Sequence, residues 1–175
     1  LFPGADADGR PHAERAAEVY RQARAERGDD ASPVETWLAM STDHTFRAGA
    51  LKLAELHAAH TPEVFVYQFA WRAATPGKPQ GAVHALELPF VFGTLDRSEV
   101  GAIAGRTAAA RELSGKMQDA WLAFARSGRP VSPGLPEWPP YAPPRRATLE
   151  LGEKPQILEA PGEQERRWWD AFIEG

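Results

Sequence analysis

A run of eight residues, from Val64 to Trp71, constrains the fold more than any other stretch of the chain. It reads Val-Phe-Val-Tyr-Gln-Phe-Ala-Trp, and β-branched and aromatic residues of this kind favour strands. The run follows a helical pattern, and a strand this apolar is typical of a parallel sheet whose two faces are both covered. The sequence therefore predicts an α/β fold with a strand at about 64–71.

Most of the remaining chain has helical patterns. The segment 12–27 is rich in Ala, Glu and Arg, and Gly28 follows it as a C-cap. Ser32, Pro33 and Glu35 together form a typical helix start. The residues 87–92 suggest a buried turn or short helix, and a short strand is expected at 147–151. The predicted helices are 12–27, 33–41, 43–60, 106–126 and 163–173.

Composition excludes several function classes. The chain has 175 residues, with 20 Lys and Arg against 24 Asp and Glu, so its net charge is −4. This charge gives no basic field for nucleic acid and no polybasic membrane anchor. No apolar run approaches 18 residues and no signal-peptide pattern is visible, which favours a cytoplasmic protein. The chain begins at Leu1 rather than Met, so a lost leader stays open.

Two weak metal patterns are better explained without a metal. His57-x-x-His60 places two imidazoles on one helical face, but no Cys or further His lies near them. Asp6-Ala7-Asp8-Gly9 is only half of a calcium loop. We therefore expect solvated histidines at the first position and a turn at the second, with no metal at either.

The segment 72–93 is a loop that carries a single histidine, His84, just before a dense apolar block. Imidazole titrates near pH 7, so loop histidines often carry proton-transfer chemistry. A histidine that lies just beyond a sheet strand is also placed where α/β proteins put their sites. The residues alone give no second catalytic group beside it, so an ordinary loop histidine is the simpler interpretation at this point.

The surrounding sequence changes that interpretation. Gly-x-x-His-x-x-Glu-Leu-Pro-Phe-Val-Phe-Gly, from Gly81 to Gly93, resembles the catalytic-histidine block of the type-B carboxylesterases. These are the cholinesterase-like and para-nitrobenzyl esterase-like branch of the α/β-hydrolases. Further segments resemble the family in the same order: Asp43-x-x-Phe46-Arg47, Val66-Tyr67-Gln68-Phe69-x-Trp71, Trp121-x-x-Phe124-Ala125, Trp138-Pro-x-Tyr141 and Ala147-Thr148-Leu149.

The resemblance implies that residues 1–175 are the C-terminal portion of a single carboxylesterase domain, with the last two sheet strands at about 64–71 and 147–151. It implies that His84 is the base of a Ser-His-Glu triad that hydrolyses small-molecule carboxylic esters without metal or cofactor. The nucleophile should lie in a Gly-x-Ser-x-Gly elbow, and no serine of this chain does. The partner would be the remainder of the same enzyme, and the segment alone should be inert.

Three neighbours of His84 have open roles. Glu87 is interpreted as a buried carboxylate that supports the site from behind His84 or, equally, as a loop-to-helix capping acid. Leu86 is a candidate for the wall of the substrate pocket, with plain core as the alternative. The family usually has glycine after the histidine, and Ala85 there suggests a slightly different loop conformation.

Two other functions stay open at this stage. One is a cholinesterase-like adhesion or binding domain that has lost catalysis. The other is an independent α-rich interaction module with no relation to esterases.

Overall fold

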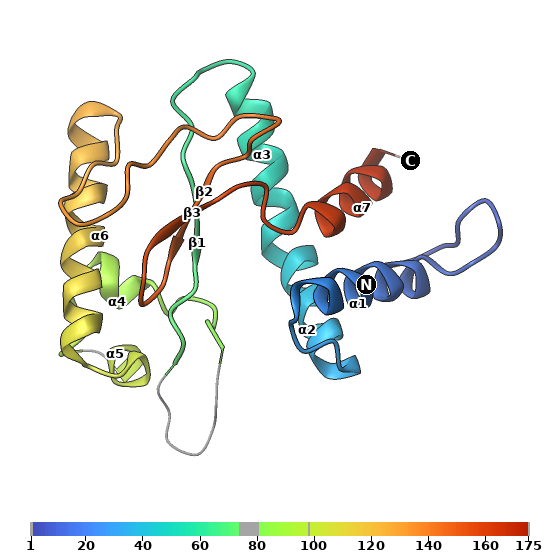
Figure 1. Cartoon of the computed structure of the whole chain (residues 1–175), viewed down its shortest axis with the longest axis horizontal. Helices are drawn as coiled ribbons and strands as arrows, with labels where there is room; N and C mark the ends of the chain where they lie inside the picture. The colour runs from blue at the N-terminus through green and yellow to red at the C-terminus, as the bar shows by residue number, and fades with distance from the viewer. Residues whose placement is uncertain (1, 74–80, 98, 175) are drawn as a thin grey trace. The chain divides into compact units, whose positions relative to one another are not determined.

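The computed structural model describes residues 2–73, 81–97 and 99–174. The chain forms two compact units, Leu1–Leu56 with Pro161–Gly175 and His57–Ala160. The first unit is helical, and the second contains a sheet with helices packed against it (Figure 1).

The first unit is built from α1 (His12–Arg27), α2 (Pro33–Thr42), η1 (Asp43–Arg47), α3 (Ala48–Ala58) and α7 (Glu163–Glu174). The bounds of α1 agree with the predicted helix, and Gly28 ends it with a φ of 76°. Ser32 caps α2 as expected, because its hydroxyl accepts the N–H of Glu35.

The predicted break between helices at residue 42 was wrong. Asp43–Arg47 is a π-helical turn that continues α2 directly into α3. Asp43 does not cap a new helix, because its buried carboxylate accepts a 2.6 Å hydrogen bond from the hydroxyl of Tyr20. A π turn widens the helix locally and is a known way of redirecting a side chain.

A mixed aromatic and polar core holds the first unit together. Tyr20 and Trp169 are buried, and the indole Nε1 of Trp169 donates to the Tyr20 hydroxyl over 2.7 Å. Burial raises the pKa of Asp43, although the guanidinium of Arg47 acts in the opposite direction. The remaining core residues of this unit are Phe2, Ala16 and Met40, with Trp168 and Phe172 packed against them.

The sheet of the second unit has the order β1-β2-β3. β1 (Val66–Phe69) runs parallel to β2 (Thr148–Leu151), with Val66 beside Thr148. These two strands confirm the predicted pair at 64–71 and 147–151, in shorter form. The antiparallel β3 (Gln156–Leu158) was not predicted. Its three residues are too few to give a clear alternation of apolar and polar side chains.

One expectation about β1 is not met within this unit. A strand with two covered faces should be buried, but Tyr67 and Gln68 are exposed at its centre, whereas β2 is mostly buried. The physical reason is position, because β1 pairs with β2 alone in the described residues and so forms the sheet edge.

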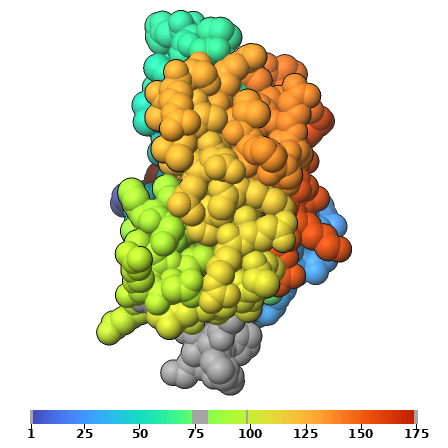
Figure 2. Space-filling model, turned by 90° about the vertical axis from the view of Figure 1, so that its left-hand side faces the viewer, coloured from blue at the N-terminus to red at the C-terminus, as the bar shows by residue number. Residues whose placement is uncertain are grey.

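Three helices complete the second unit: α4 (Leu88–Val91), α5 (Glu99–Ala104) and α6 (Ala108–Ser127). The short helix at α4 was expected, and α5 was not. α6 begins two residues later than predicted, because the Thr107 hydroxyl accepts the N–H of Ala110 and caps it. Figure 2 shows α6 beside the segment of α4 and α5 on one face. Among the described helices, none has the length and apolar character needed to cross a membrane.

Two helical glycines of the second unit offer a matched test of this packing. A Cβ on Gly101 would lie 2.1 Å from the carbonyl oxygen of Leu95, whereas a Cβ on Gly115 meets nothing within 4 Å. We expect Gly101→Ala to lower the free energy of unfolding by about 1–3 kcal/mol, because the backbone must move. Gly115→Ala should raise it by up to about 1 kcal/mol through helix propensity. Urea unfolding followed by circular dichroism measures both, and equal effects would contradict the packing.

Candidate active site

The turn that carries His84 is ordered by its own main chain. The N–H of Leu86 donates to the Val83 carbonyl over 3.2 Å, and the N–H of Leu88 donates to the Ala85 carbonyl over 3.3 Å. Ala73 donates to the Gly81 carbonyl over 3.4 Å, which closes the loop at its base. Residues 74–80 of the predicted histidine loop lie outside the described residues.

His84 and Leu86 occupy opposite environments within this turn. The side chain of His84 is exposed, whereas Leu86 is 0% exposed. Leu86 belongs to the core of the second unit, together with Trp71, Phe90 and Met117. The turn therefore exposes the imidazole of His84, while the buried side chain of Leu86, two residues later, anchors the turn.

Ala85, between these two residues, has a left-handed backbone with a φ of 65°. An L-residue pays about 1–2 kcal/mol in this region, whereas glycine adopts it freely. The difference from the usual family glycine therefore does not remove the left-handed conformation. Alanine adopts it at an energetic cost.

Glu87 is the N-cap residue that immediately precedes α4, and it is half-buried. Its carbonyl accepts the N–H groups of Phe90 and Val91 over 2.9 and 3.0 Å. Its carboxylate makes no capping hydrogen bond to α4, so the capping role considered from the sequence is not observed. The negative charge instead acts on Tyr67 of β1. Although the residue is 38% exposed, partial desolvation of its phenol is the main cause that raises the pKa of Tyr67, and the Glu87 carboxylate adds to it.

A polar network that the sequence did not reveal holds α4 against α6. The hydroxyl of Ser114 is buried and donates to the carbonyl of Phe90 over 2.7 Å. Gln118 Nε2 in turn donates to the Ser114 hydroxyl over 3.1 Å. The available signal was a serine on the apolar face of α6, beside Leu113 and Met117. The Ser114 hydroxyl therefore has a structural role in these hydrogen bonds and is not placed as a nucleophile.

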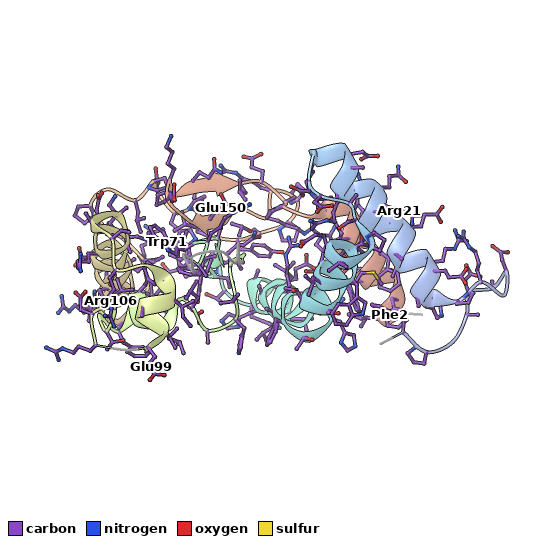
Figure 3. All side chains as sticks on the ribbon, turned by 90° about the horizontal axis from the view of Figure 1, so that it is seen from below. Phe2, Arg21, Trp71, Glu99, Arg106 and Glu150 are labelled. Carbon is purple, nitrogen blue, oxygen red and sulfur yellow. The ribbon has the colours of Figure 1, made fainter. Side chains whose placement is uncertain are left out.

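Trp71 connects the end of β1 with α5. Its indole Nε1 donates to the Ala104 carbonyl over 2.9 Å, and both residues are buried. Figure 3 labels Trp71 together with Glu99, the first residue of α5, and Arg106, which follows that helix. The scaffold that supports the turn with His84 thus consists of β1, α4, α5 and α6.

The structure also bears on metal binding. Among residues 2–73, 81–97 and 99–174, no group of three or more His, Asp or Glu side chains is placed to hold a metal ion. His57 lies in the last turn of α3 and His60 in the turn that follows it, and both are exposed. Asp6 accepts the N–H groups of Asp8 and Arg10 and pairs with Arg15 at 2.7 Å, which is the arrangement of a turn.

The sequence profile of the carboxylesterase family matches residues 6–169. The chain belongs to the carboxylesterase family. It is 35% identical to the para-nitrobenzyl esterase of Bacillus subtilis over 161 residues, which cover 91% of this chain and 30% of that protein. The resemblance to type-B carboxylesterases is therefore confirmed.

Solved structures agree with this assignment. A thermophilic PNB esterase superposes with a TM-score of 0.71 at 34% identity, covering 92% of this chain and 31% of that one. A carboxylesterase of Geobacillus stearothermophilus gives 0.68 at 33% identity, covering 87% and 31%. These neighbours confirm the α/β-hydrolase fold class. The chain spans about 30% of the length of these carboxylesterase relatives.

The strain at Ala85 can be measured. We expect Ala85→Gly to raise the free energy of unfolding by roughly 0.5–1 kcal/mol, because the lost strain exceeds the added entropy of the unfolded chain. Ala82→Gly is the matched control in the same loop, since the φ of Ala82 is not positive. It should lower stability by a similar amount. Thermal unfolding distinguishes the two, and a destabilising Ala85→Gly would contradict the left-handed turn.

The electrostatic contact between Glu87 and Tyr67 predicts a coupled titration. The folded pKa of Tyr67 lies above its ordinary value, so the phenol form stabilises the fold, and this contribution is lost as the pH rises through the raised pKa. Glu87→Gln should lower the pKa of Tyr67 partway, because burial remains. Absorbance titration of the phenolate, with Tyr67→Phe to assign the signal, measures this. An unchanged pKa would place the Glu87 carboxylate away from the ring.

Proposed function

We propose that this chain is the segment of a serine carboxylesterase that supplies the triad histidine, His84. The single observation that carries the proposal is the placement of an exposed imidazole on an anchored turn, within a chain of the carboxylesterase family. The substrate class is the carboxylic ester, and the reaction is hydrolysis through an acyl-enzyme.

In this proposal His84 works as general base and then as general acid. It accepts the proton of a serine hydroxyl as that oxygen attacks the ester carbonyl, and it donates the proton to the departing alcohol. Water then repeats the cycle on the acyl-enzyme. An acidic residue would hold the tautomer of the imidazole and stabilise the imidazolium.

The neighbours of His84 support this role in different ways. Glu87 is proposed as a supporting carboxylate of the site, and its charge already acts on the nearby Tyr67. Leu86 fixes the turn by its burial in the core. The side chain of Leu86 is fully enclosed in the second unit. Its role as a wall of the substrate pocket stays a prediction.

The proposed partner is the remainder of the same enzyme. Triad serine and acid, together with the oxyanion-hole donors, would come from that part. The edge of β1 and its exposed Tyr67 are features that a neighbouring strand would cover. The 175-residue chain alone is proposed to be inert, because an imidazole without nucleophile and oxyanion donors gives little rate over water.

A non-catalytic binding domain of the same family is the second candidate. None of the six serines in this chain has the Gly-x-Ser-x-Gly context, so the serine in the remainder of the domain would distinguish the two candidates. Retention of the histidine block favours the catalytic proposal over this one.

Hydrolysis of a p-nitrophenyl ester tests the proposal in a protein that joins this segment to the rest of its carboxylesterase domain. His84→Ala should lower kcat by about 10⁴-fold or more, because triad residues act as a unit. His57→Ala is the matched control, since His57 is an exposed histidine at a helix end, and it should leave the rate unchanged. A folded protein without esterase activity would favour the binding domain, and full activity of His84→Ala would remove His84 from the mechanism.

A further inference from the structure

A groove of about 500 Å³ lies between α1 and α2 in the first unit. Its walls are mostly apolar, and its volume falls within the range of small-molecule sites. Ala13 and Ala17 face it from α1, while Trp37, 56% exposed, flanks it from α2. The small side chains of α1 leave the space that larger residues would fill.

The groove has an apolar end and a cationic end. The short segment 28–32 joins α1 to α2, and the ion pair between Arg24 and Glu35 at 3.7 Å shows that late α1 lies beside early α2. Arg21 therefore lines the end near this connection, and the buried Phe2 and Met40 line the other. Figure 3 labels both residues and shows Phe2, which precedes α1, apart from Arg21 on that helix.

Arg21 is the only charged residue that lines the groove within the described chain. Its guanidinium forms no ion pair or hydrogen bond with another described side chain. Acidic residues of the same helices have other partners, since Glu18 pairs with Arg10 at 3.1 Å and Glu35 pairs with Arg24. A cation beside apolar walls, with no anionic partner among the described residues, complements an anion that carries an apolar tail.

The other polar group of the groove does not compete for this anion. The hydroxyl of Thr36 donates to the carbonyl of Ala31 over 3.3 Å. Trp37 contributes an uncharged indole, so Arg21 is the charged partner for the anionic end of a ligand, and its planar guanidinium matches the two oxygens of a carboxylate.

We propose that the groove between α1 and α2 binds a small monocarboxylate with an apolar tail, whose carboxylate pairs with Arg21 and whose tail lies against Ala17, Trp37 and Met40. The binding itself does not depend on the esterase activity. Acids of this class are products of ester hydrolysis, so a role in retaining product would rest on the proposed function.

Isothermal titration of the full chain with octanoate tests the proposal. We expect saturable binding at one site, and Arg21→Gln should weaken it about tenfold through loss of the charge-assisted pair. Arg126→Gln is the matched control, because Arg126 is an exposed arginine of α6 in the other unit, and it should leave affinity unchanged. Octanol, which has the tail without the charge, should bind equally to the natural chain and to Arg21→Gln.

Filling the groove provides the second arm. Ala17→Leu should abolish octanoate binding, and Ala13→Leu, at a more exposed position of the same stripe, repeats the test if Ala17→Leu does not fold by circular dichroism. Absence of saturable binding, equal affinity of Arg21→Gln and the natural chain, or full binding by the filled variants would overturn the proposal. His84→Ala should leave octanoate binding intact, so failure of this proposal and of the catalytic one are distinguishable.

Discussion

The burial of Leu86 and Phe90 against α6 is the interaction on which the second unit depends. Both side chains are fully buried, and they join the apolar face of α6 to the end of β1 through Trp71. Enclosing two such side chains stabilises the fold by roughly 3–6 kcal/mol. The same burial fixes the main chain on either side of Leu86, and that constraint presents the exposed His84 at a defined place.

The first unit depends on a polar contact instead. The carboxylate of Asp43 loses most of its hydration on folding, and the hydrogen bond from Tyr20 and the charge of Arg47 offset part of that cost. Trp169 completes the chain by donating to Tyr20. Because one group of side chains links α1, the π turn and α7, loss of any member would leave a buried polar atom without its partner.

Much of the fold was open to prediction because it depends on local rules. The bounds of α1, the serine cap of α2 and the parallel pair of strands follow from composition, capping residues and apolar runs. β3 and α5 were missed because each is short and held by its neighbours. The predicted break at residue 42 was wrong. Asp43 instead accepts a hydrogen bond from Tyr20, a tertiary contact that the local sequence does not encode.

The sequence by itself determined the family and singled out His84, because the order and spacing of the family motifs can be read directly from the linear chain. Only the tertiary structure decided how that residue is presented. The left-handed backbone of Ala85, the burial of Leu86, the charge of Glu87 acting on Tyr67 and the groove beside Arg21 each arise from residues distant in the chain or from a backbone conformation that alanine rarely adopts. Side-chain identity fixes which contacts are possible, and packing selects those that form.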